Sequence, residues 1–146
     1  MVDAEAAARR WADAWRRAWP AKDPEPLAAV YAAGAAFRSQ PFREPHVGRE
    51  GVLEYARWAF ADQQGFRGCW FGAPLAAGDR AIVEYWAVVL ENGQEVTIAG
   101  VALLRFDSDG RVRAQRDYWA LEAGDRQPFR GLGHMVGGRA RATLCP

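Results

Sequence analysis

A chain of 146 residues fits one domain with room for a hydrophobic core. Half of the residues are hydrophobic and a quarter are charged, the ordinary balance of a soluble globular protein. The net charge of +1 argues against nucleic acid as the main partner, because binding to phosphates needs a surplus of basic residues.

The cysteines and the N-terminus bear on location. Cys69 and Cys145 are too few for the disulfide framework of a small secreted domain. The first residues carry two carboxylates and no apolar segment of the signal-peptide kind, and no apolar run approaches the length that spans a membrane. We therefore expect a cytoplasmic protein with no membrane partner. His46 and His134 show no metal-ligand spacing with the cysteines, so no metal is expected.

The first segment predicts an amphipathic helix from Asp3 to Trp19. Apolar residues that include Trp11, Trp15 and Trp19 recur there at steps of three and four, with Asp3 as the N-cap and Pro20 as the stop. Packing in the core is the simpler role for the indoles. The lining of a cavity by Trp15 or Trp19 is the alternative.

Two more helices and one strand are expected before the chain changes character. Asp23-Pro24 favours the start of a second helix that Gly34 ends, since Asp suits the cap and Pro the first position. A short strand from Ala36 to Gln40 and a loop with two prolines follow. The third helix runs from Val47 to about Ala61.

From Phe66 onward the apolar residues alternate, which is typical of strands. Asn92-Gly93 is the best hairpin signal in the chain, and Asp107 to Gly110 predicts a second tight turn. The expected strands are Phe66–Pro74, Ala81–Leu90, Glu95–Phe106 and Arg111–Leu121. Because no helices separate them, the order predicts an α+β fold with antiparallel strands.

The last of these strands can be divided into two faces at a period of two. One face carries Arg113, Gln115, Asp117 and Trp119, and the other carries Val112, Ala114, Arg116 and Tyr118. A carboxylate beside an indole indicates either a pocket, with Asp117 inside it, or an ion pair at the rim with Arg113 or a later arginine. The residues alone leave both open.

Residues 124–146 differ in composition from the rest. They are rich in Gly and Arg and lack apolar periodicity. We expect a C-terminal extension, separate from a domain of residues 1–123, that packs on the body, on a partner subunit or across a pocket mouth. His134 would matter only if this extension covered the opening.

Three segments resemble the SnoaL-like polyketide cyclases and the ketosteroid isomerases of the nuclear transport factor 2-like superfamily. They are Tyr31–Val52, Glu91–Val112 and Arg116–Leu121. The resemblance implies a cone, in which a curved and mainly antiparallel sheet wraps around three N-terminal helices. It also implies a deep pocket at the open end and a homodimer formed through the convex face of the sheet.

The resemblance also argues against steroid isomerisation. The family's tyrosine donor falls at Trp15, its general-base aspartate at Ser39 and its protonated acid at Ala102, so all three groups are replaced. The family's pocket tryptophan falls at Trp119. That match would turn Asp117 toward the cavity.

We therefore predict a cofactor-free acid/base enzyme of the cyclase, isomerase or dehydratase type. Its ligand would be a small apolar, aromatic or polycyclic molecule. Burial in an apolar wall raises the pKa of a carboxyl, which suits Asp117 to proton transfer, and His46 is a second candidate acid/base over the mouth. The candidate ligand-binding residues are Trp15, Trp19, Phe37, Ser39, Tyr55, Trp70, Tyr85, Ile98, Ala102, Gln115 and Trp119.

Two alternatives stay open on the same fold. One is a binding protein that uses the cavity without chemistry. The other is a dimerisation module whose cone is filled by Trp15, Trp19, Trp70 and Trp119.

Overall fold

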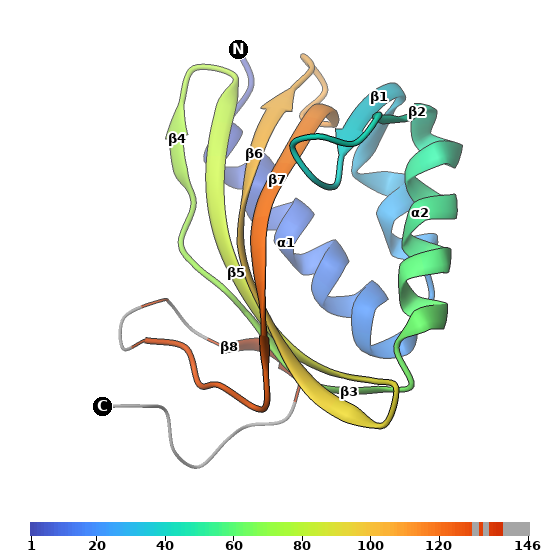
Figure 1. The fold of residues 1–146 in the computed structure, drawn as a ribbon. Coiled ribbons are helices and arrows are strands. Elements are labelled where there is room, and N and C mark those ends of the chain that lie inside the picture. The colour runs from blue at the N-terminus through green and yellow to red at the C-terminus, as the bar shows by residue number, and fades with distance from the viewer. Residues whose placement is uncertain (130–131, 133–134, 139–146) are drawn as a thin grey trace.

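A curved sheet wraps around two α-helices (Figure 1). The computed structural model describes residues 1–129, 132 and 135–138. Helices and sheet follow one another in the α+β order expected from the sequence. No helix of the described residues is long and apolar enough to cross a membrane.

The first helix, α1, spans Ala4–Ala21. The side chain of Asp3 caps it by accepting a hydrogen bond from the Ala6 N–H, as predicted. Pro20 does not stop the helix but lies in its last turn. The stop comes at Lys22, whose backbone adopts the left-handed conformation with φ 53° and donates its N–H to the carbonyls of Ala18 and Trp19.

The prediction of a second helix up to Gly34 is wrong. Only a 3₁₀ turn, η1, forms over Glu25–Ala29, and strand β1 begins at once and spans Tyr31–Arg38. The alanine-rich run favours a helix locally, but the parallel pairing of β1 with a later strand overrides this propensity. Tyr31 therefore belongs to the sheet.

Strand β2, His46–Val47, pairs with β1 and leads into helix α2, Gly48–Asp62. This helix forms where the sequence predicts the third helix, and it buries an apolar stripe. The buried residues of the stripe are Val52, Leu53, Ala56 and Phe60.

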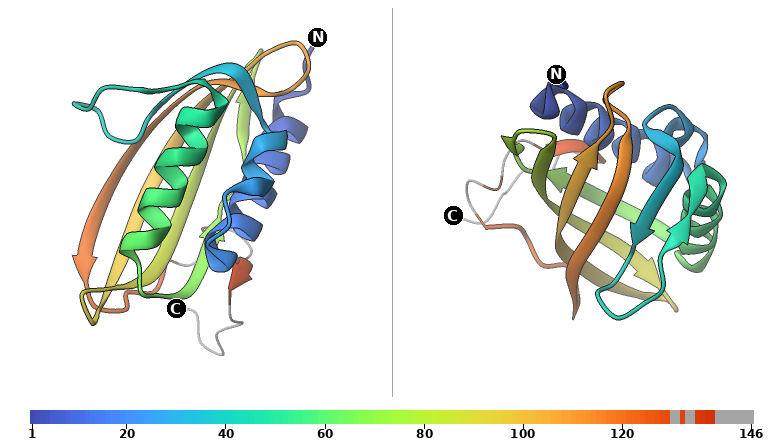
Figure 2. Two further views of the ribbon diagram at one scale, coloured as in Figure 1. Left: turned by 90° about the vertical axis from the view of Figure 1, so that its right-hand side faces the viewer. Right: turned by 90° about the horizontal axis from the view of Figure 1, so that it is seen from above.

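The remaining strands are mostly long and antiparallel. They are β3 Gly65–Phe71, β4 Leu75–Ala77, β5 Arg80–Glu91, β6 Gln94–Phe106, β7 Val112–Ala123 and β8 Met135–Gly138. The order across the sheet is β2-β1-β7-β6-β5-β3-β8, with β4 beside the first residues of β5. Among the strands that the structure describes, only β1 and β7 pair in parallel. The view from above in Figure 2 shows the sheet curving around the helices.

The turn between β5 and β6 forms as the sequence predicts. Asn92 and Gly93 have φ angles of 50° and 77°, the positive values that a two-residue hairpin turn needs. The segment 124–146 contains a strand that the sequence did not predict. This strand, β8, pairs with β3.

A β-bulge in β7 corrects the assignment of faces. Phe106 pairs with Val112 and Arg105 with Ala114, so Arg113 is the extra residue of the pair β6–β7. Val112 consequently turns into the core, whereas Arg113 is exposed. From Gln115 onward the predicted alternation holds.

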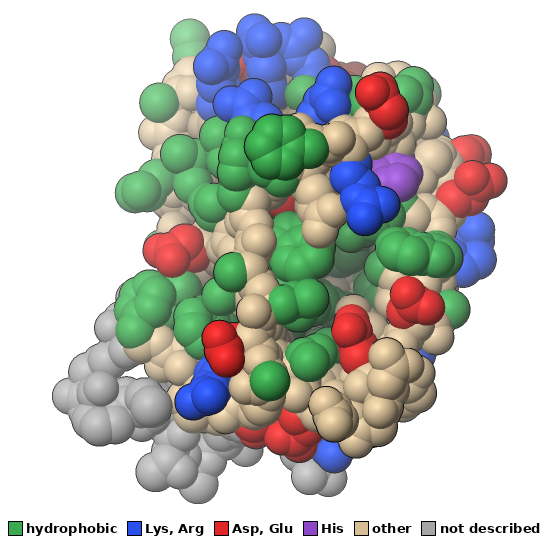
Figure 3. All heavy atoms as spheres, in the orientation of Figure 1, with side chains coloured by type: hydrophobic (Ala, Val, Ile, Leu, Met, Phe, Trp, Pro, Cys, Tyr) green, Lys and Arg blue, Asp and Glu red, His purple; other side chains and the backbone are tan. Residues whose placement is uncertain are grey.

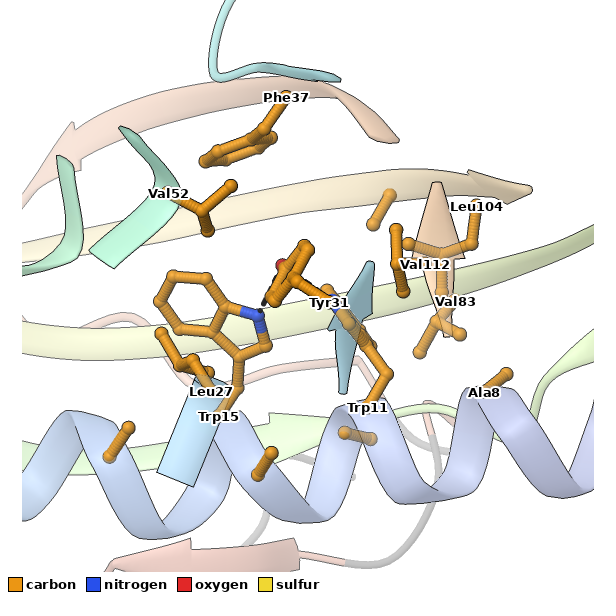
Figure 4. Close-up of a cluster of buried hydrophobic side chains, with 14 of the residues drawn as sticks. Ala8, Trp11, Trp15, Leu27, Tyr31, Phe37, Val52, Val83, Leu104 and Val112 are labelled. Carbon is orange, nitrogen blue, oxygen red and sulfur yellow. Dashed lines mark hydrogen bonds between the residues drawn. The ribbon is translucent and has the colours of Figure 1, made fainter. Parts of the chain in front are cut away.

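The main core fills the concave side of the sheet. Figure 4 shows the indoles of Trp11 and Trp15 on α1 directed toward Tyr31, among aliphatic side chains from the sheet and α2. A second, smaller cluster lies on the other side of the sheet and contains Trp70, Val88 and Leu132.

Candidate functional site

A cavity of about 550 Å³ lies between the concave face of the sheet and the two helices. Its walls are mainly aromatic and aliphatic. The size is that of a small-molecule site, and such sites are apolar with a few convergent polar groups. His46, the purple side chain in Figure 3, lies at its rim.

Most of the residues singled out in the sequence line this cavity. They are Trp15, Trp19, Phe37, Ser39, His46, Tyr55, Tyr85, Ile98, Gln115, Asp117 and Trp119. The indoles therefore leave an open volume between them and do not fill the cone.

Two of the proposed lining residues lie elsewhere. Trp70 is paired with Trp86 in the sheet, and both point to the outer side, where Trp70 packs against Val88. The reason is the pleat: its neighbour Cys69 occupies the inner face. Ala102 does face inward but is fully buried in the core, beside Asp117 on the neighbouring strand, and does not reach the cavity.

Asp117, on β7, is the buried carboxyl of the site, with 8% of the residue exposed. The Tyr85 hydroxyl donates to Oδ2 over 3.1 Å, and the Gln115 amide nitrogen donates to Oδ1 over 2.9 Å. Burial raises the pKa of Asp117 to about 7, while these two hydrogen bonds oppose the rise. The predicted alternative of an ion pair with Arg113 is wrong, because Arg113 lies 3.5 Å from Asp79 outside the cavity. The later arginines at positions 130, 139 and 141, and His134, lie outside the described residues.

The orientation of the Gln115 amide is fixed from the opposite side. Its Oε1 accepts hydrogen bonds from the indole of Trp11 and from the hydroxyl of Tyr31. An indole N–H only donates. Gln115 must therefore keep its oxygen toward Trp11 and its NH₂ group toward Asp117.

Tyr31 links α1 to this chain of hydrogen bonds. Its hydroxyl accepts from the indoles of Trp11 and Trp15, each over 3.0 Å, and donates to Gln115. Burial holds the pKa of Tyr31 far above its ordinary value, so the hydroxyl keeps its proton. Donors thus run in one direction, from α1 through Tyr31 and Gln115 to Asp117.

Tyr85 depends on a glycine for its position. A Cβ at Gly100 would lie 2.7 Å from the Cβ of Trp119 and 2.8 Å from the ring and hydroxyl of Tyr85. Gly100 pairs with both residues, one on each neighbouring strand. The missing side chain lets Tyr85 reach Asp117. Burial, followed by the charge of Asp117, keeps the pKa of Tyr85 well above normal, so it remains a donor.

Aromatic rings from β1, β2 and α2 stack at the mouth. The ring of His46 lies 4.6 Å from that of Tyr55, and Phe37 meets Tyr55 edge to face at 5.0 Å. Partial burial lowers the pKa of His46, which favours the neutral imidazole. The indole of Trp119 donates to the carbonyl of Ser39 over 2.6 Å and joins β7 to this mouth.

The sequence did not single out several residues of the site. Trp11 is one of the indoles for which core packing is the simpler prediction, and Tyr31 falls within the predicted second helix, which does not form. Gln63 accepts from the indole of Trp19 over 2.7 Å at the far end of the cavity. Trp11 lies one helical turn before Trp15 on the same face of α1, and this spacing is the sequence signal that could have placed it in the site. The position of Tyr31 depends on the pairing of β1 with β7, which no local signal predicts.

The described residues bring together no group of three or more His, Cys, Asp or Glu side chains that could hold a metal ion. The groups that converge are a carboxyl with a near-neutral pKa, two neutral donors that fix it, and an apolar volume beside it. Such an arrangement can take up or release a proton close to a bound apolar molecule.

Residues 8–115 match the family model described as the SnoaL-like domain. The chain belongs to this family. The match ends two residues before Asp117, so the carboxyl of this SnoaL-like domain lies just outside the matched segment. Comparison with curated proteins finds no significant match.

Solved structures share the fold of this SnoaL-like domain. A putative isomerase from Rhodopseudomonas palustris has a TM-score of 0.64 at 19% identity, over 77% of this chain and 88% of that one. An LEH-like epoxide hydrolase from M. tuberculosis gives 0.62 at 18%, over 80% and 82%. A protein with a ketosteroid isomerase-like fold from Catenulispora acidiphila, in complex with trimethylamine, gives 0.63 at 20%, over 73% and 82%. At these identities the likeness shows the fold alone.

Proposed function

We propose that this SnoaL-like domain is a cofactor-free enzyme that transfers a proton on a small apolar or polycyclic metabolite. Asp117 is the acid/base, Tyr85 and Gln115 hold its carboxyl in place, and the aromatic walls bind the substrate. Cyclisation, isomerisation and dehydration all need such a step. Two of the similar structures are named as a putative isomerase and an LEH-like epoxide hydrolase, and both names support an enzyme on this fold.

The observation that carries the proposal is the environment of Asp117. A general acid or base works best when its pKa lies near the operating pH, and burial brings the pKa of Asp117 to about 7. Its hydrogen-bond partners are neutral, and no residue of the described part of the chain forms an ion pair with it. His46 at the mouth is the second candidate group, as a neutral base.

The test combines binding with turnover. Wild-type protein is screened by thermal shift against polycyclic, terpenoid and aromatic compounds, and each compound that stabilises it is incubated with the protein and followed by chromatography and mass spectrometry. We expect Asp117→Asn to lower turnover by about 10²- to 10⁴-fold, the range of general acid/base catalysis. Binding should persist, because the introduced amide has nearly the same shape.

The control is Asp79→Asn, which changes an exposed carboxylate on the outer side of the protein. Turnover should stay at the wild-type rate in this variant. Unchanged turnover in Asp117→Asn would exclude Asp117 as the catalytic group. Ligands that bind both proteins equally, with no turnover in either, would instead favour a binding protein without chemistry.

We also propose that the domain forms a homodimer through the convex face of the sheet near Tyr118. This side chain is 46% exposed on β7, next to Val101 on β6. An exposed aromatic ring on an otherwise regular sheet face suits an interface. Sedimentation of wild type and Tyr118→Asp tests this, and a monomeric wild type would contradict it.

A further inference from the structure

A groove on the outer side of the sheet combines positive charge with exposed apolar surface. It lies between β4 and the loop that joins β1 to β2, and four of its lining residues are arginines: Arg38, Arg80, Arg105 and Arg116. No Asp or Glu lines it. Figure 3 shows Lys and Arg side chains gathered at the upper end of this face, over β5, β6 and β7.

Strand register explains how the arginine groove is built. One row across the sheet runs from Arg38 and Arg116 through Leu103 to Ile82 and Leu75. The next row contains Arg105 and Arg80 as direct partners. Leu75 and Ile82 are 75% and 43% exposed, so an apolar half adjoins the charged half of the groove.

The positive charge of the arginine groove is not balanced within the described part of the protein. Arg38 and Arg116 are paired positions on β1 and β7, where like charges oppose the pairing of strands. Neither forms an ion pair with a described carboxylate. Asp79, at the edge, is shared by Arg80, Arg105 and Arg113. Among the described carboxylates, Asp79 alone pairs with arginines that line the groove, and it pairs with Arg80 and Arg105 but not with Arg38 or Arg116.

The spread of the charges decides what kind of ligand fits. The four lining arginines lie on four neighbouring strands, which span about 14 Å at the usual strand spacing. A single small anion reaches one or two of them. A ligand with several carboxylates along its length reaches all four.

Two other occupants fit less well. The homodimer proposed above is centred on Tyr118 and Val101, two residues along β7 and β6 from the pair Arg116–Leu103 in the groove. A second copy placed face to face over the groove itself would bring the same unbalanced arginines against their own kind. Single-stranded nucleic acid binds through aromatic side chains that stack on bases, and no aromatic residue is among those that line the groove.

We propose that the arginine groove binds an acidic, partly apolar segment of another protein. The carboxylates of the segment pair with Arg38, Arg80, Arg105 and Arg116, and its apolar side chains cover Leu75, Ile82 and Leu103. This surface is on the opposite side of the sheet from Asp117, so the proposal does not depend on catalysis.

The test uses a fluorescent twelve-residue peptide made of equal numbers of Glu and Leu, with fluorescence anisotropy as the readout. We expect the affinity of the wild-type chain to fall by at least about ten-fold in Arg38→Ala/Arg116→Ala and to weaken with added salt. Leu75→Ser should weaken binding as well. Circular dichroism checks that each variant is folded.

The matched control is Arg17→Ala/Arg57→Ala, which removes the same charge from exposed positions on the two helices. It should bind the peptide like wild type. An equal loss of peptide affinity in both double variants would show that only the net charge matters and would overturn the proposal. A peptide that does not bind the wild-type chain would overturn it as well. A wild-type dimer that dissociates only in Arg38→Ala/Arg116→Ala would assign the groove to a second copy, and anionic lipid vesicles bound more tightly than the peptide would assign it to a membrane. Both results also overturn it.

Discussion

Asp117 illustrates how neighbouring residues set the chemistry of one side chain. The carboxyl is buried among apolar walls, which favours its neutral form, and receives two hydrogen bonds, which favour its charged form. The first effect is the larger. Both donors are neutral, because Gln115 is an amide and burial keeps the pKa of the Tyr85 hydroxyl well above its ordinary value. The result is a carboxyl that changes its protonation near pH 7.

This pKa has a consequence for stability. Between the ordinary pKa of 3.8 and the folded value of about 7, the folded protein holds a proton that the unfolded chain has lost. The free energy of unfolding must therefore fall as the pH rises through this window and level off above it. The full effect is on the order of 4 kcal/mol, at 1.36 kcal/mol for each unit of pKa.

We expect Asp117→Asn to remove this dependence. The introduced amide still accepts from Gln115 and can donate to the Tyr85 hydroxyl, so the variant should fold. Urea unfolding, followed by tryptophan fluorescence, should show the variant gaining on wild type from pH 5 to pH 8. The titration of His46 is common to both proteins and cancels in the difference. A difference that does not change with pH would contradict a raised pKa for Asp117.

At the scale of strands, the site depends on a glycine in the middle one of three neighbouring strands, which leaves room for aromatic side chains from the strands on either side. Tyr85 on β5 and Trp119 on β7 both lean over Gly100 on β6. Alternation and turn residues are local signals, and they predicted the long late strands, their hairpins and the shared face of Gln115, Asp117 and Trp119. The resemblance to known families, and not the alternation, implied that this face turns inward. The sequence could not predict the bulge at Arg113, since an extra residue is recognised only against its partner strand.

Gly100→Ala should disturb the site because Tyr85 and Trp119 both lie against this glycine. The new methyl group must displace Tyr85 or Trp119, at a cost of about 1–3 kcal/mol in the free energy of unfolding. Loss of the hydrogen bond from Tyr85 should raise the pKa of Asp117 further and shift the pH profile of turnover upward. Gly34→Ala is the control, because a Cβ at Gly34 meets no atom within 4 Å. A Gly100→Ala protein with the wild-type pH profile would show that Tyr85 does not tune Asp117.

At the scale of the whole molecule, the cone keeps a volume of about 550 Å³ unfilled although the chain is rich in large aromatic residues. The α+β class and the curved sheet were predictable from the order of the elements and their resemblance to known families. The position of Tyr31 was not predictable, because its neighbours favour a helix locally and the parallel pairing of β1 with β7 overrides this propensity. The outward turn of Trp70 likewise follows from strand register, which composition does not contain.

A substitution that fills the cavity should abolish ligand binding while the protein still folds. Ile98→Trp places an indole into the open volume, so it should abolish the thermal shift produced by any ligand of the cavity. The free energy of unfolding should rise by about 1 kcal/mol, as cavity filling commonly does. Ile82→Trp makes the same change on the outer face and should leave the ligand response intact. A ligand that still stabilises Ile98→Trp would bind somewhere other than this cavity.

The chain of donors that begins at the indoles of Trp11 and Trp15 also limits how protons travel. An indole cannot accept a proton from a hydroxyl, so this chain has a fixed polarity and no second arrangement of its hydrogens. A proton on Asp117 therefore has no relay through α1 to the solvent behind it. It enters and leaves on the cavity side, and while a bound molecule fills that side, the proton and the molecule are confined together. In the proposed reaction, this closed back of the site favours the return of a proton to the molecule that gave it.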